Sequence, residues 1–206
     1  MTREARHEPG GGAPSLSSED VEYVRANFCT LDELCADTGY SPSEIREAID
    51  RELLPRASYA LPDGTEMYPP DYLVFVDEAG GPEQVHDYFA ERYRAAREFQ
   101  SGQTDALDEV WRGYLDGAYG VCLRSVTPEA IVREDTLVSR ICELLILARP
   151  GDADWRASLR TAVEELDALE RELSPLDDRV RFGQLTTRDL VVYAAIERFP
   201  EVFNPC

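Results

Sequence analysis

The sequence predicts a mainly α-helical protein with an N-terminal winged helix-turn-helix-like domain, which contains a small β-hairpin, and a C-terminal α-helical bundle. Two observations predict this fold class. Apolar residues recur three and four positions apart along most of the 206 residues, which is the spacing of one helix face. The dipeptide Asp63-Gly64 separates two short strand-like runs, which is typical of a hairpin turn. We expect a disordered leader over residues 1–17, the winged-helix-like domain over 18–80 and the bundle over 81–206.

The first predicted helix follows the leader, which is polar and rich in Gly, Pro and Ser. Ser17 and Asp20 have the spacing of a capping box at its start, and Val21, Val24 and Phe28 share one of its faces. A helix that begins with a cap and carries one apolar stripe is expected to pack on a core along that stripe.

Two short helices joined by a tight turn come next. The first begins with the capping pair Thr30 and Glu33 and ends at Gly39. The second begins at the cap Ser41 and stops before Pro55. This arrangement is a helix-turn-helix.

A predicted β-hairpin over residues 57–68 and a helix over residues 71–79 follow. A helix-turn-helix followed by a hairpin is the order of a winged helix, and residues 30–75 resemble the DNA-binding domain of MerR-type regulators. The second of the two helices, however, carries four acidic residues against two arginines, so DNA binding is not expected. The resemblance rests on Glu33-Leu34, Thr38-Gly39, Ser41, Ile45-Arg46, Leu53-Leu54-Pro55, Gly64, Tyr68 and Asp71-Tyr72-Leu73.

The bundle is expected to begin after Gly80-Gly81-Pro82, which is the strongest break in the pattern. The last of its helices is apolar nearly all round and is expected to lie centrally. The predicted helices run from Val85 past Tyr93, from Leu107 to near Gly117, from Thr127 to Pro150, from the cap Asp154 to Pro175, and from the cap Thr186 with Asp189 through Ile196.

The composition excludes several kinds of chemistry. All 21 basic residues are arginines, so a Schiff-base lysine and a phosphate-loop lysine are absent. With only two histidines, His7 in the predicted leader and His86, the sequence disfavours a Ser-His-Asp triad and a multi-histidine metal site. The net charge of −20 repels phosphate backbones. We therefore expect no cofactor, no metal and no nucleic-acid partner.

Cysteine usage and hydropathy predict the compartment. The five cysteines are odd in number and none has CxxC spacing, which favours reduced thiols. The N-terminus has no apolar core of a signal peptide, and no run of about 18 apolar residues occurs. The sequence therefore predicts a cytoplasmic protein without a membrane segment.

The segment from residue 117 to 129 is the first candidate site, because it is flanked by glycine, lies between two helices and gathers several reactive side chains. We predict Tyr119, Cys122 and Glu129 as catalytic residues and Arg124 and Arg133 as residues that bind an anionic substrate. Simpler interpretations stay open: Tyr119 only packs, Cys122 is a small buried apolar group, and Glu129 pairs with Arg133 four residues later.

Two further clusters are candidates. In the hairpin we predict Asp63 as catalytic and Tyr59 and Tyr68 as substrate-binding; the alternative is a turn with ordinary surface acids. Near the C-terminus we predict Arg181 and Arg188 as substrate-binding; the alternative is a solvated linker with ion pairs. Whether the three clusters form one pocket is left open.

Three stretches of the chain together resemble a known family. They are Ser58-Tyr59-Ala60-Leu61-Pro62-Asp63-Gly64, Tyr119-Gly120-Val121-Cys122-Leu123-Arg124 with Thr127-Pro128-Glu129, and Arg179-Val180-Arg181-Phe182-Gly183. The chain resembles the DUF6058 family, a domain of unknown function, over roughly residues 20–200. The resemblance implies bacterial natural-product biosynthesis in actinomycetes, but it implies no reaction and no catalytic residue.

Two functions from different classes follow. The first is a cofactor-free acid/base enzyme that cyclises, eliminates from or isomerises a small anionic or amino-acid-derived biosynthetic intermediate. The second is a non-catalytic partner subunit or regulator of a biosynthetic enzyme, with a homodimer or a partner enzyme bound by the bundle. A deep polar pocket between the hairpin and the bundle would favour the enzyme. A broad exposed apolar patch would favour the partner subunit or regulator.

Overall fold

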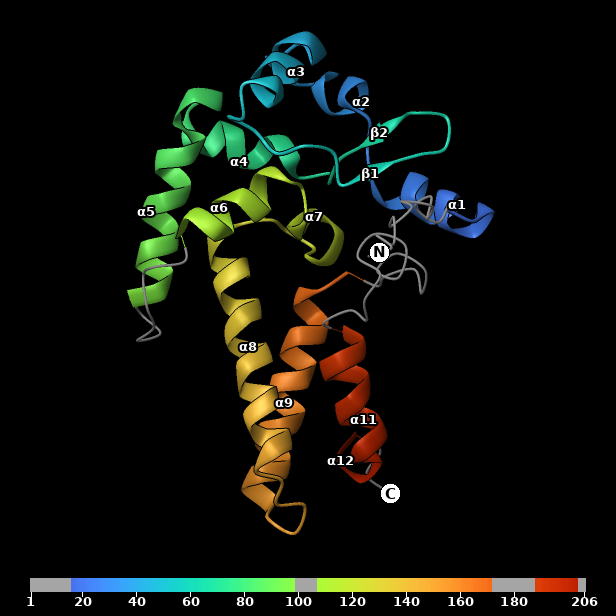
Figure 1. Ribbon diagram of the computed structural model, residues 1–206, viewed down its shortest axis with the longest axis vertical. Coiled ribbons are helices and arrows are strands. Elements are labelled where there is room, and N and C mark those ends of the chain that lie inside the picture. The colour runs from blue at the N-terminus through green and yellow to red at the C-terminus, as the bar shows by residue number, and fades with distance from the viewer. Residues whose placement is uncertain (1–15, 99–106, 172–187, 204–206) are drawn as a thin grey trace, which may run out of the picture.

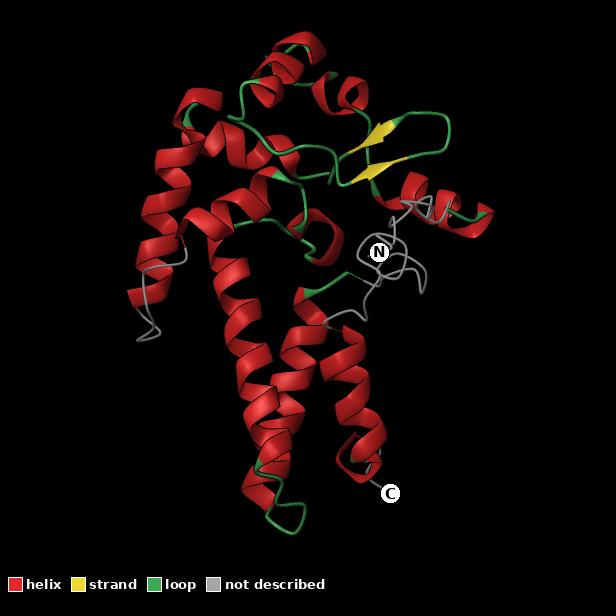
Figure 2. Ribbon diagram, in the orientation of Figure 1, coloured by secondary structure: helices red, strands yellow, loops and turns green. Residues whose placement is uncertain are grey.

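The computed structural model describes residues 16–98, 107–171 and 188–203 (Figure 1). The described part is mainly helical with one small antiparallel sheet of two strands, which confirms the predicted class at this level (Figure 2). Almost all of the predicted leader lies outside the described residues.

Three short helices open the described chain, and each begins with a capping box as predicted. In every box the side chain of the first residue accepts a backbone N–H while the acidic residue three positions later accepts the N–H of the first, so the exposed donors of the helix end are satisfied. The helices are α1 (Ser18–Asn27), α2 (Leu31–Cys35) and α3 (Pro42–Asp50).

The predicted hairpin is present. Strand β1 (Tyr59–Ala60) pairs with β2 (Glu66–Met67) in antiparallel register. At its tip Gly64 has a φ of 84°, a conformation that glycine adopts without strain. The helix α4 (Tyr72–Ala79) follows, as expected.

Packing is continuous across the predicted domain boundary. Gly80 and Gly81 both have positive φ, and a short 3₁₀ turn, η1 (Pro82–Gln84), leads into α5 (Val85–Glu98). One cluster of buried apolar side chains nevertheless contains residues from both sides, from Leu31 to Val132. The boundary near residue 80 stays a prediction; the side chains show no break in packing there.

The long helices of the predicted bundle are present, with two differences. A short helix, α7 (Tyr119–Cys122), occupies part of the segment 117–129 between two predicted helices, where no helix was predicted. The cap of α9 is Asp152, so the predicted cap Asp154 is wrong: the Asp152 Oδ1 atom accepts from the backbone N–H of Asp154 at 2.9 Å. The helices are α6 (Leu107–Leu115), α8 (Pro128–Ile146) and α9 (Ala153–Leu169).

The C-terminal segment packs beside α8 and α9 (Figure 1). It begins as a π-helix, η2 (Arg188–Tyr193), and continues as α11 (Ala194–Arg198) and α12 (Pro200–Phe203). Val191, Val192 and Ala195 are buried, whereas Leu190 and Tyr193 are more than half exposed, so this segment lies at the side of the bundle and not at its centre. Its predicted cap Thr186 lies outside the described residues.

Within the described ranges, none of the helices combines the length and the apolar character needed to cross a lipid bilayer.

Candidate functional site

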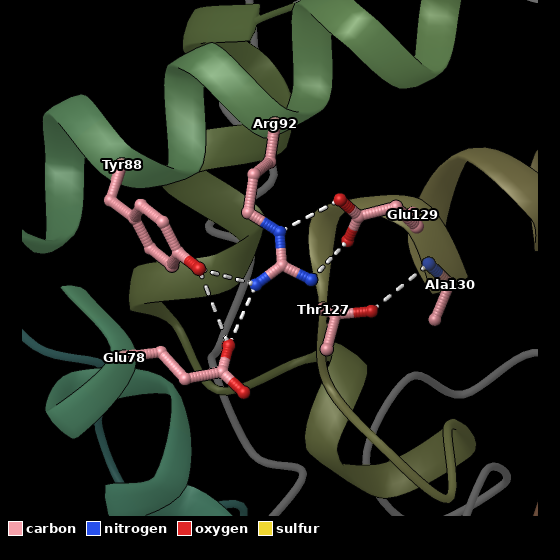
Figure 3. Close-up of polar contacts among 6 residues, drawn as sticks. All are labelled: Glu78, Tyr88, Arg92, Thr127, Glu129 and Ala130. Atoms are coloured by element: carbon pink, nitrogen blue, oxygen red, sulfur yellow. Dashed lines mark hydrogen bonds and ion pairs between the residues drawn. The ribbon is translucent and has the colours of Figure 1, made fainter.

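Arg92 on α5 connects three helices through its guanidinium (Figure 3). Its Nε and Nη2 atoms donate to the two carboxylate oxygens of Glu129, in the first turn of α8, at 2.7 and 2.8 Å. Its Nη1 atom donates to Glu78 on α4 at 2.8 Å and to the Tyr88 hydroxyl at 3.1 Å. This bidentate pair fixes α8 against α5, so Glu129 has a structural partner.

The pKa of Glu129 reflects this pairing. Partial burial of its carboxyl raises the pKa, but the hydrogen bonds and charge of Arg92 outweigh burial and lower it overall. Glu129 does not pair with Arg133, so that interpretation is wrong; Arg133 pairs with Glu165 on α9 instead. Since each of the two faces a different neighbouring helix, tertiary contacts override the pairing that their spacing favours.

Tyr119, the first residue of α7, lies against α6. A Cβ atom added at Gly113 would stand 3.3 Å from the Tyr119 hydroxyl, so the glycine leaves room for the ring. Burial, and then the nearby charge of Glu134, raise the pKa of Tyr119 to about 12. Its hydroxyl makes no hydrogen bond with any described residue.

Glu134 on α8 is the functional candidate that the sequence analysis missed. Burial, with a contribution from Asp135, raises the pKa of its carboxyl to about 7. Among the described residues it has neither a hydrogen bond nor an ion pair. A signal was present in the sequence, because Glu134 stands three residues from both Ile131 and Leu137, which are buried on the same helix.

A chain of polar contacts joins α5 and α8 near Tyr119 and Glu134. The Arg97 Nε atom donates to the Tyr93 hydroxyl at 3.1 Å, and its Nη2 atom is 2.8 Å from the Asp135 Oδ2 atom. These contacts, the hydrogen bond to Tyr93 above all, raise the pKa of Arg97, so it stays charged. The chain holds α5 against α8 next to Tyr119 and Glu134.

Tyr119 and Glu134 together are suited to proton transfer. A carboxyl with a pKa of about 7 is present in both protonation states at neutral pH, which favours both uptake and release of a proton. A phenol with a pKa of about 12 stays protonated and can donate a hydrogen bond to a negative charge that develops on a substrate.

The other predicted residues of this segment have structural surroundings. The Cys122 thiol donates to the backbone oxygen of Ala118 at 3.8 Å, and its side chain packs on the apolar cluster around Val24 and Phe28. Arg124 is exposed, and its backbone N–H donates to Leu169 at 3.1 Å at the end of α9. Cys122 adds a small electrostatic contribution to the raised pKa of Tyr119, whereas no hydrogen bond or ion pair of the described chain joins Arg124 to Tyr119 or Glu134.

The three candidate residues of the hairpin do not lie in one site. Asp63 at the tip is exposed and pairs with Arg25 of α1 at 2.9 Å. Tyr59 and Tyr68 are buried and line a groove between α3 and the hairpin. Tyr68 donates to Glu66 at 3.1 Å. The hairpin therefore places its two tyrosines together and its aspartate elsewhere.

Two of the three predicted clusters meet at a cavity. Ser58 from the hairpin side and Gly120 from α7 line it, and the Ser58 hydroxyl donates to the backbone oxygen of Gly117 at 3.2 Å. The cavity measures about 20 Å³, which suits one water molecule and not a metabolite. Of the third cluster, Arg181 lies outside the described residues, and only the backbone of Arg188 is described.

No group of three or more His, Cys, Asp and Glu side chains that could hold a metal ion occurs in the part of the chain that the structure describes.

Comparison with known proteins places the chain in a family. A family model described as a family of unknown function, DUF6058, matches residues 84–200. Because the match covers more than half of the chain, the protein belongs to the DUF6058 family. The matched region runs from α5 through α11 and contains Tyr119 and Glu134, whereas residues 30–75 lie outside it. No curated protein and no solved structure matches.

Proposed function

We propose that this protein is a cofactor-free acid/base enzyme of bacterial natural-product biosynthesis that acts on a small amino-acid-derived or anionic intermediate. One observation carries the proposal: the charge of Glu134 contributes to the raised pKa of the Tyr119 phenol, and both groups are partly buried and have no hydrogen-bond partner among the described residues. Groups left unpaired in such surroundings are typical of catalytic sites.

In the proposed reaction the Glu134 carboxylate takes a proton from carbon or nitrogen of the substrate. The Tyr119 hydroxyl donates a hydrogen bond to the oxygen on which negative charge develops. Protonated Glu134 then returns the proton to a different position, which completes an isomerisation, or to a leaving group, which completes an elimination or cyclisation. Atoms and charge balance without an added reagent.

Exchange of substrate protons with solvent tests this proposal. The common amino acids and their 2-oxo acids are incubated with the protein in D₂O, and NMR measures deuterium at the α-carbon of each amino acid and at C3, next to the keto group, of each 2-oxo acid. We expect exchange in at least one compound, and a decrease of about 100-fold or more in Glu134→Gln because general acid/base groups contribute at least that much. Tyr119→Phe retains the Glu134 base, so its exchange rate is expected to decrease less than that of Glu134→Gln.

The matched control is Glu164→Gln, which changes an exposed glutamate on α9 and is expected to leave exchange unchanged. Exchange at the protein-free rate for every compound, or exchange that Glu134→Gln does not reduce, would contradict the proposal.

A second function, a non-catalytic partner subunit, is favoured by one observation. Ile146 and Leu147, at the end of α8, are 79% and 65% exposed. Adjacent exposed apolar side chains of this size are common where another chain binds. A protein that shows no exchange but elutes as a larger complex with a neighbouring biosynthetic enzyme would support this function.

We propose further that α2, α3 and the hairpin form a winged-helix-like unit that does not bind nucleic acid, in a cytoplasmic protein. The supporting observation is charge: Glu44, Glu47 and Asp50 accompany Arg46 on α3, and a helix in the major groove lies against phosphates.

A further inference from the structure

A groove of about 570 Å³ lies between α3 and the hairpin, at the end of the molecule opposite the α8–α9 turn (Figure 1). Its volume is in the range of small-molecule sites. Tyr59, Tyr68, Ile49 and Ala57 supply apolar surface to its wall. Both tyrosines are less than one-tenth exposed, so this part of the wall is held by the fold.

Charges of both signs line the same groove. Arg46 and Arg56 are exposed, and neither guanidinium makes a hydrogen bond or an ion pair with a described residue. The carboxylates of Asp50 and Glu52 likewise have no such partner within the described ranges. Positive and negative groups therefore face one space without neutralising each other.

The backbone at the edge of the groove is strained. Glu52 has a φ of 57°, and it is the one residue other than glycine with positive φ among the described residues. The left-handed conformation costs a side-chain-bearing residue about 1 kcal/mol or more, and residues that retain it cluster at binding and catalytic sites. Here the turn places the Glu52 carboxylate along the groove.

The chemistry of the wall selects among ligands. A simple anion would satisfy the arginines and leave the carboxylates opposed, and a nucleic acid would meet three carboxylates, including Glu66, beside its phosphates. A zwitterion satisfies both signs: its carboxylate binds an arginine, and its ammonium group binds a carboxylate. Its side chain can contact Tyr59 and Tyr68.

We propose that this groove binds a small zwitterion of the amino-acid class with an apolar or aromatic side chain. The site is separate from Tyr119 and Glu134, and the inference does not rest on the proposed function.

Calorimetric titration of the full chain tests this inference. The probes are L-phenylalanine, L-tyrosine, L-tryptophan and L-leucine, together with 3-phenylpropionate and 2-phenylethylamine, which each lack one charge of phenylalanine. We expect at least one amino acid to bind with a Kd below about 1 mM, and the phenylalanine analogues to bind about tenfold or more weakly than phenylalanine.

Variants locate the binding. Arg46→Gln and Asp50→Asn are expected to weaken binding of the amino acid about tenfold, whereas Arg94→Gln, which changes an exposed arginine on α5 outside the groove, leaves it unchanged. Failure of all four amino acids to bind, equal binding of 3-phenylpropionate and phenylalanine, or binding that only Glu134→Gln removes would each overturn the proposal. Circular dichroism of each variant verifies that it is folded.

Discussion

A partly buried carboxyl group without a hydrogen bond or ion pair lowers the stability of its protein, and Glu134 is such a group among the described residues. Folding raises its pKa from 4.5 to about 7. Below pH 4.5 both the folded and the unfolded chain hold the proton, so folding is not penalised there. Between pH 4.5 and about 7 the unfolded chain releases this proton while the folded chain retains it, so the free energy of unfolding decreases across that range and levels off above it.

The first prediction follows from this decrease of the free energy of unfolding with rising pH. Glu134→Gln is expected to be more stable than the parent protein by up to about 3 kcal/mol near pH 8, and by less than about 1 kcal/mol near pH 5. Urea denaturation at both pH values measures the difference. The exposed Glu164→Gln serves as the control. A stability gain that is the same at both pH values would contradict the raised pKa of Glu134.

Contacts between elements decide how closely α7 approaches the hairpin side of the protein. Gly120 on α7 stands against Ser58 and Pro69: a Cβ atom added there would overlap the Ser58 hydroxyl and stand 2.8 Å from the Pro69 Cγ atom. Both neighbours are buried, so neither moves away without disturbing the packing around it.

The second prediction follows from this approach. Gly120→Ala is expected to lower the free energy of unfolding by about 1–3 kcal/mol, because the added methyl group overpacks the junction. The matched control is Gly39→Ala, where nothing lies within 4 Å of the added atom. Thermal or urea unfolding of both variants compares them, and equal stability of the two would show that the junction has free space.

The third prediction concerns the helices that Arg92 joins. Arg92→Gln leaves Glu78 and Glu129 without their shared cation, and we expect a loss of about 1–2 kcal/mol, since the pairs are partly exposed. Arg51→Gln removes a single ion pair, with Glu83, in which both side chains are more than half exposed, and is expected to cost less than about 0.5 kcal/mol. Urea denaturation measures both. Equal losses would show that the bidentate geometry contributes nothing.

At the scale of the whole molecule, two apolar clusters share α8. Residues such as Ile131 and Val132, in its first turns, belong to the cluster that contains α2 to α6, whereas Leu137 and Ile141 belong to the cluster with α9 and η2. One continuous helix therefore connects the two parts of the core.

The fourth prediction tests how independent these parts are. Leu159 on α9 is fully buried in the second cluster, and Leu159→Ala is expected to cost about 2–5 kcal/mol. Hydrogen exchange measured by mass spectrometry is expected to increase most in α9, α11 and the second half of α8, and less in α2 to α4. An equal increase throughout would show that the two clusters unfold as one unit.

The sequence by itself determined the helical class, the hairpin and the starts of α1, α2, α3 and α8. Three capping boxes, the Asp63-Gly64 turn and the helical spacing of apolar residues depend on neighbours within a few positions, so local patterns suffice to predict them. The resemblance to the DUF6058 family is confirmed by the comparison with known families, but over residues 84–200 and not from residue 20 as expected, so the hairpin stretch 58–64 lies outside the match.

Only the tertiary structure decided which side chains meet. Tyr119 was predicted as a candidate, but its neighbour Glu134 was not, because residues on α7 and α8 approach through helix packing. Glu129 and Arg133 have the spacing of an ion pair, yet Arg92 and Glu165 from other helices take them as partners. The pKa of a carboxyl depends on burial and on charges distant in sequence, and sequence spacing records neither.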